Sequence, residues 1–153
     1  MPREFKDLND AEKELMIDAI PLITILVAGA DGEIDEKELA SAEKITKVRS
    51  YDFNSQLKTY FKRVGEQFED RLNKYIADLP KDADKRNMAI AEILGGLNPI
   101  LHKMDDFDAA IYYKNFRSFA KHVAESSGGI FVFLTIGPKE ADVVELPMLE
   151  VFE

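Results

Sequence analysis

The fold is decided by the stretch Val27–Ile45, which reads VAGADGEIDEKELASAEKI. It leaves an apolar segment, passes through a short acidic loop with glycines, and enters a second segment with helical periodicity. Asp35 is placed to be the N-cap of that second helix, and Glu38, three residues later, completes a capping box. Ile34 and Leu39 flank this pair as a hydrophobic staple. The stretch therefore predicts a helix, a tight loop and a second helix.

The same helical periodicity extends over most of the chain. We expect helices over residues 10–28, 35–49, 55–79, 82–94 and 105–123, a short helical turn over 99–102, and a last helix from residue 138. Pro21 lies inside the first of these and predicts a kink or break, and Pro147 predicts a break in the last. The expected fold is an all-α helical bundle of about six to seven helices, formed by one domain that spans residues 1–153.

A second segment repeats part of the pattern of the first. It begins at Val123 and reads VAESSGGIFVFLTIGPKEADVVEL. Ile34-Asp35-Glu36-Lys37-Glu38 aligns with Ile136-Gly137-Pro138-Lys139-Glu140, and Glu43 aligns with Glu145. The second loop is six residues longer than the first. The match predicts two pseudo-repeated helix-loop-helix halves whose hairpins superpose.

Composition excludes several classes of protein. The chain of 153 residues carries a net charge of −9, which disfavours direct binding to nucleic acid. It contains no cysteine, so disulfides, thiol nucleophiles and cysteine-based metal sites are excluded. Its first ten residues have no apolar segment typical of a signal peptide, and its longest uncharged runs hold 12 and 13 residues, too few to span a membrane. We expect a cytoplasmic protein.

The acidic loop also suggests a site for a divalent cation. Aligned as a calcium-binding EF-hand loop with Gly32 at position 6, it has Val27 and Gly29 where two ligands are needed, so a regular EF-hand is rejected. The candidate ligands are the carboxylates of Asp31, Asp35 and Glu38, with Glu33 and Glu36 nearby. Such oxygen ligands favour Ca²⁺ or Mg²⁺, bound weakly. A plain turn with a helix cap explains the same residues without any metal.

Motifs for other chemistry are missing from the sequence. There is no G-x-S-x-G elbow for a serine nucleophile and no G-x-x-x-x-G-K-[ST] loop for phosphate. Neither of the two histidines follows a glutamate by three residues, which excludes the E-x-x-H pairs of a carboxylate-bridged di-iron site. No catalytic residue is predicted.

The apolar run Ile130–Ile136 has the composition of a strand but stands alone in the sequence. Two interpretations are open. The run folds back and covers the bundle, or Phe131, Phe133 and Leu134 form an exposed patch that binds a partner or a membrane surface.

Two motifs together resemble the TerB-like family, which is associated with tellurite resistance. They are A-D-G-E-I-D-x-x-E-L over Ala30–Leu39 and A-E-S-S-G-G-I-F-x-F, followed by a Lys-Glu pair, within Val123–Glu140. The resemblance implies an all-α fold of two related halves, a bacterial cytoplasmic stress-related protein without catalytic activity, and an acidic face that meets metal ions. The second loop lacks an Asp-Gly pair, so the metal residues that the resemblance implies are Asp31, Asp35 and Glu38.

From these observations we predict that the chain is a non-enzymatic TerB-like interaction module. It is expected to bind protein partners and to carry a weak divalent-cation site. Two alternatives remain. One is a metal-dependent hydrolase that uses the clustered carboxylates, and the other is a membrane-surface adaptor that works in a membrane-associated complex.

Overall fold

The computed structural model describes residues 2–30, 32–52, 56–126 and 143–152. Its elements are the short 3-10 helix η1 (Arg3–Phe5) and the helices α1 (Asp10–Ala28), α2 (Glu36–Ser50), α3 (Lys58–Asp78), α4 (Ala83–Gly95), α5 (Leu97–His102) and α6 (Asp106–Glu125). The described residues contain no strand. The prediction of an all-α helical bundle is therefore confirmed.

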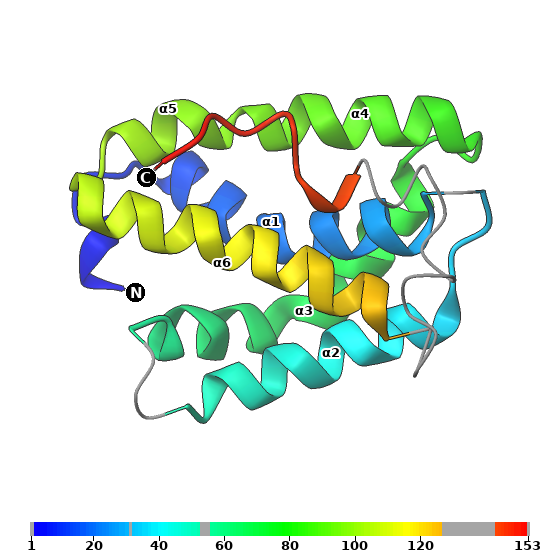
Figure 1. The fold of residues 1–153 in the computed structure, drawn as a ribbon, viewed down its shortest axis with the longest axis horizontal. Coiled ribbons are helices and arrows are strands. Elements are labelled where there is room, and N and C mark those ends of the chain that lie inside the picture. The colour runs from blue at the N-terminus through cyan, green and yellow to red at the C-terminus, as the bar shows by residue number, and fades with distance from the viewer. Residues whose placement is uncertain (1, 31, 53–55, 127–142, 153) are drawn as a thin grey trace.

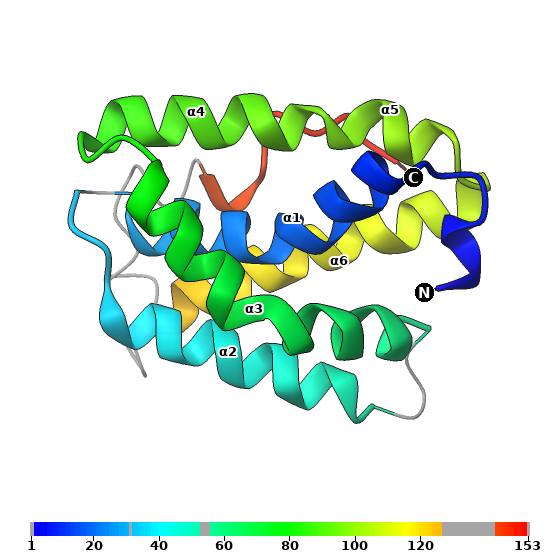
Figure 2. The ribbon, with the colours of Figure 1, turned by 180° about the vertical axis from the view of Figure 1, so that it is seen from behind.

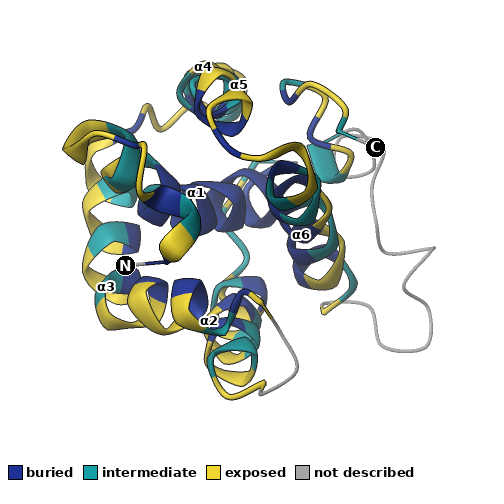
Figure 3. Ribbon diagram, turned by 90° about the vertical axis from the view of Figure 1, so that its left-hand side faces the viewer, coloured by how far each residue is buried: buried dark blue, intermediate teal, exposed yellow. Residues whose placement is uncertain are grey.

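Helix α1 lies at the centre of the molecule. It contacts every other α-helix, and nearly all of its residues from Met16 to Ala28 are buried. Viewed end on, α1 has α3 on one side, α6 on the other, α2 below and the rod of α4 and α5 above (Figure 3). This segment is apolar except for Asp18 and Thr24, and a helix that is hydrophobic on nearly all sides must be covered on nearly all sides.

The interface between α1 and α3 holds aromatic and charged contacts. The Tyr60 hydroxyl donates to the carbonyl of Met16 over 2.5 Å, inside an aromatic cluster that joins α3 to η1 and α6. Nearer the surface, the Arg71 guanidinium pairs with Asp18 at 2.5 Å and with Glu14. These contacts fix how α3 lies against the central helix (Figure 2).

The sequence predicts a kink or a break at Pro21, and the break is wrong. Helix α1 is continuous from Asp10 to Ala28, and Pro21 is buried within it. Proline removes only one backbone donor, and the five surrounding helices hold the segment in place. One turn later, the buried Thr24 hydroxyl donates to the carbonyl of Ile20 at 2.8 Å.

The pseudo-repeat is not supported, and the last predicted helix stays a prediction because most of its span is not described. Residues 127–142, which include most of the second loop and the expected helix start at Pro138, lie outside the described residues. Residues 145–152 form turns and irregular chain beside α5 and α6 (Figure 1). They are tied there by hydrogen bonds from the Asn98 amide to the carbonyl of Met148 and from the Glu150 amide to Asn98. Residues 143 and 144 are helical, and no helix described after residue 136 is long enough to be matched with α2.

Among the described residues, none of the helices combines the length and apolar character that crossing a bilayer would require.

The cap of α2 gives a first prediction. The Asp35 carboxylate accepts the backbone N–H groups of Lys37 at 2.8 Å and Glu38 at 3.2 Å. Asp35→Ala removes both acceptors, so we expect the free energy of unfolding to fall by about 0.5–2 kcal/mol with the fold retained. Urea denaturation followed by circular dichroism measures this change. Lys37→Ala, at an exposed position of the same turn, is the control, and an Asp35→Ala midpoint equal to that of the control would contradict the role of the cap.

Candidate functional site

The turn between α1 and α2 contains the predicted metal residues. Asp35 is the N-cap of α2, as predicted, so its carboxylate is already engaged by two backbone N–H groups. Glu38 is 1% exposed, and Glu33 and Glu36 are exposed. Asp31 lies outside the described residues. Within the part of the chain that the structure describes, no three acidic or histidine side chains gather as a metal site would require.

The expected capping box differs from the one observed. The backbone N–H of Asp35 donates to the carbonyl of Ala28 at 2.9 Å rather than to Glu38, so only half of the box forms at this turn. A complete capping box instead opens α1, where Asn9 and Glu12 bond to each other's backbone N–H groups. The start of α1 agrees with the prediction from the sequence, whereas this capping box was not predicted.

The turn is held from outside by α4. Arg86 is buried, and its guanidinium donates to the carbonyl of Gly29 at 2.7 Å and to that of Gly32 at 2.6 Å. The Asn87 amide donates to the carbonyl of Ala30 at 3.3 Å. Gly29 is needed here because a Cβ atom at this position would lie 2.5 Å from the Arg86 guanidinium. The arrangement explains the turn as a structural joint that needs no ion.

The predicted partner-binding residues Phe131, Phe133 and Leu134 lie outside the described residues. The structure therefore leaves both interpretations of that apolar run as predictions.

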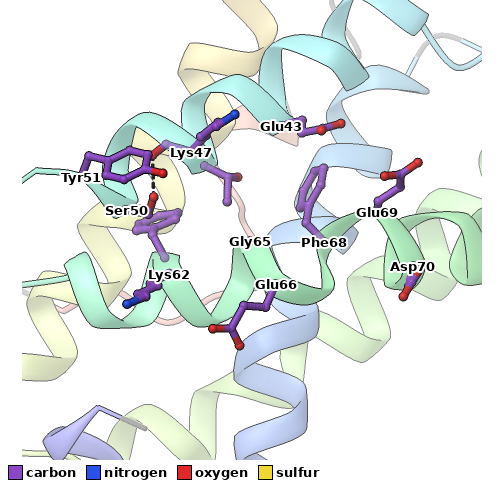
Figure 4. A pocket seen from close by; sticks show the side chains of 12 residues that line it. Glu43, Lys47, Ser50, Tyr51, Lys62, Gly65, Glu66, Phe68, Glu69 and Asp70 are labelled. Carbon is purple, nitrogen blue, oxygen red and sulfur yellow. Dashed lines mark hydrogen bonds between the residues drawn. The ribbon is translucent and has the colours of Figure 1, made fainter.

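A groove between α2 and α3 forms a surface hollow among the described residues. Its volume is about 550 Å³. We call it the α2–α3 groove. It is lined by one stripe of each helix (Figure 4). These residues are Glu43, Thr46, Lys47 and Ser50 from α2 with its C-cap Tyr51, and Phe61, Lys62, Gly65, Glu66, Phe68, Glu69 and Asp70 from α3.

Gly65 leaves the centre of the groove open. A Cβ atom added there would touch only Thr46, at 3.9 Å, so the position has space for a side chain. The buried side chains of Thr46, Phe61 and Phe68 form the floor, and charged side chains form the rim. Tyr51, at one end, is 67% exposed, and Val48 beside it on α2 is 62% exposed. The groove thus combines a closed floor, a charged rim and adjoining apolar surface.

Arg49 packs against Phe61, one of the residues that form the floor of the groove. Its guanidinium lies over the rings of Phe61 and Phe119, at 5.4 and 5.7 Å from their centroids, and so joins α2 to α3 and α6. It also donates to Asn115 at 2.5 Å and contacts Nδ1 of His122 at 3.1 Å. Burial lowers the pKa of Arg49. Because a guanidinium can only donate, this contact is a hydrogen bond when Nδ1 of His122 is the acceptor.

A second hollow of about 640 Å³ lies where η1 approaches the start of α6. Several of its charged groups already have partners: Lys103 pairs with Glu12 at 2.7 Å, Glu4 accepts from Tyr112 at 3.0 Å, and Asp105 caps α6. Fewer of its charges are available to a ligand, so the α2–α3 groove is the stronger candidate.

Sequence reasoning did not predict the groove. The available signal was Gly65, which stands inside a long helical pattern without a cap or turn to explain it. A glycine in such a position indicates that something packs closely or that space is left open, but only the pairing of α2 with α3 shows which.

Comparison with known proteins adds no further evidence: no protein-family profile, curated protein or solved structure matches this chain.

The Arg86 contacts give a second prediction. Arg86→Met keeps much of the apolar stem but leaves the carbonyls of Gly29 and Gly32 without their donor, so we expect the free energy of unfolding to fall by about 1–3 kcal/mol. Urea denaturation measures the loss, and Lys85→Met, at the exposed neighbouring position, is the matched control. Equal midpoints for the two variants would show that water replaces the guanidinium at little cost.

The occupied cap gives a third prediction. Binding a cation to Asp35 would compete with its two backbone hydrogen bonds, and the positive end of the α2 dipole opposes a cation at the same place. We expect a dissociation constant for Ca²⁺ or Mg²⁺ no tighter than about 10⁻⁴ M, with oxygen ligands only. Calorimetric titration of the intact chain measures it, with Asp35→Asn as the comparison. Saturation at micromolar metal would contradict this expectation.

Proposed function

We propose that this chain is a non-catalytic interaction module that binds a segment of a partner protein in the α2–α3 groove. The observation that carries the proposal is the groove itself, with Gly65 at its open centre and a charged rim of which most members form no ion pair among the described residues. Exposed tyrosine at the edge of such a hollow is typical of protein interfaces.

The composition of the groove supports binding rather than catalysis. Its lining, as the structure describes it, contains neither histidine nor cysteine, the usual general base and nucleophile near neutral pH. Neither Asp35 nor Glu38, on which a metal-dependent hydrolase would rely, lines this groove or the second hollow. The hydrolase alternative therefore gains no support from the geometry.

The resemblance to the TerB-like family is compatible with this proposal. It implies a cytoplasmic, stress-related helical protein without catalytic activity, and the segment Ala30–Leu39 carries the motif. The proposal differs in one respect: the surface that meets the partner is the groove of α2 and α3, rather than the turn that holds the motif.

The proposal is tested by filling the groove. Gly65→Phe places an aromatic side chain in the open centre, and Gly65→Ala is the matched control that leaves most of it free. A displayed library of random peptides is selected on the intact protein, and each binder is measured against both variants. We expect binders whose affinity falls at least about tenfold with Gly65→Phe and stays unchanged with Gly65→Ala.

Stability serves as the control on folding. Gly65→Ala should stabilise the protein by about 0.5–1 kcal/mol because alanine favours a helix interior. If no binder loses affinity when the groove is filled in a folded Gly65→Phe protein, the proposed function is wrong.

A further inference from the structure

The charges of the α2–α3 groove are separated by sign along its length. Lys47 and Lys62 lie at one end, beside Ser50 and Tyr51, and we call this the lysine end (Figure 4). Glu43, Glu69 and Asp70 lie at the other, which we call the acidic end. The separation follows from the chain path, since α3 returns along α2 after the connection that follows Ser50 (Figure 2).

None of the five side chains that define these two ends forms an ion pair among the described residues. This is notable because Glu43 and Lys47 are four residues apart on one helix, a spacing that allows pairing. By contrast, Glu66, near the middle of the groove, pairs with Arg63 at 3.4 Å. Both ends therefore present charge that a bound partner can neutralise.

The lining as a whole is net negative. Two lysines stand against four carboxylates, so an occupant that matches the groove carries more positive than negative charge. An anionic lipid surface or a phosphate backbone would meet this excess of carboxylates and be repelled. A uniformly basic segment would place a cation against the lysine end, and like charges brought together disfavour that partner.

We infer that the occupant is a peptide segment of a partner protein that carries opposite charges at its two ends. Its basic side chains lie against the acidic end of the groove, and an acidic side chain lies against the lysine end. A small apolar residue lies over Gly65. This inference rests on the proposed function and adds the chemistry of the partner. An exposed ion pair changes affinity by up to about fivefold, so the charges set the direction of binding and the choice of partner more than its strength.

The test uses the peptides selected on the intact protein that lose affinity with Gly65→Phe. We expect their sequences to carry basic residues at one end, an acidic residue at the other and a net positive charge. Affinity is then measured against the double variant Lys47→Glu/Lys62→Glu, for which a loss of about tenfold is expected. The matched control is Lys74→Glu/Lys114→Glu, which makes the same change of charge at exposed positions outside the groove and should leave affinity within about twofold.

A charge exchange completes the test. Replacing the acidic residue of a selected peptide by lysine should restore its affinity for Lys47→Glu/Lys62→Glu and weaken its binding to the unchanged protein. Groove-dependent peptides without charge polarity, or equal losses for the two double variants, would overturn the inference and leave the proposed function standing. If no selected peptide depends on the groove, both fail. Sedimentation that shows a dimer, which Gly65→Phe dissociates, would mean that a second copy of the chain fills the groove, and this result would also overturn the inference.

Discussion

The structure depends on the burial of residues 16–28 of the central helix α1. From Met16 to Ala28, α1 presents apolar side chains in every direction, and the hydrophobic effect favours the fold only if other helices cover all of them. Helices α2 to α6 each contact α1, and α2 packs in addition against α3 and α6. The α2–α3 groove is one result, because two helices that share a central partner meet each other along only part of their surfaces.

Local signals allowed much of the secondary structure to be predicted. The start of α1 at Asp10, the cap of α2 at Asp35 and the end of α4 at Gly95 each rest on residues within one turn of the boundary, and the structure agrees with all three to within a residue. The predicted break at Pro21 failed because surrounding helices hold α1 together, and the path of residues 145–152, which Asn98 holds against α5, was not predicted. Neither effect can be found from neighbouring residues in the sequence.

In the candidate site too, features set by neighbouring residues were predictable and features set by distant contacts were not. The role of Asp35 as a cap was predictable from the Ile34-Asp35-x-x-Glu38-Leu39 pattern, while its role as a metal ligand was one of several possibilities that acidic residues allow. The groove was not predictable, because Lys47 and Lys62 become neighbours only when α3 returns along α2. Periodicity places residues on the face of a helix but does not determine which faces meet, and the binding surface of a bundle depends on that choice.

The hydrogen bonds from Arg86 to the α1–α2 turn affect the order in which the helices become fixed. The two carbonyl acceptors of Arg86 lie 57 and 54 residues before it in the chain, so the turn between neighbouring helices is completed by a segment that is made much later. Closing so long a loop costs entropy before any contact repays it. A folding chain that has α1 and α2 but has not docked α4 would leave the carbonyls of Gly29 and Gly32 to water, and the angle between the first two helices would become fixed only when the fourth arrives.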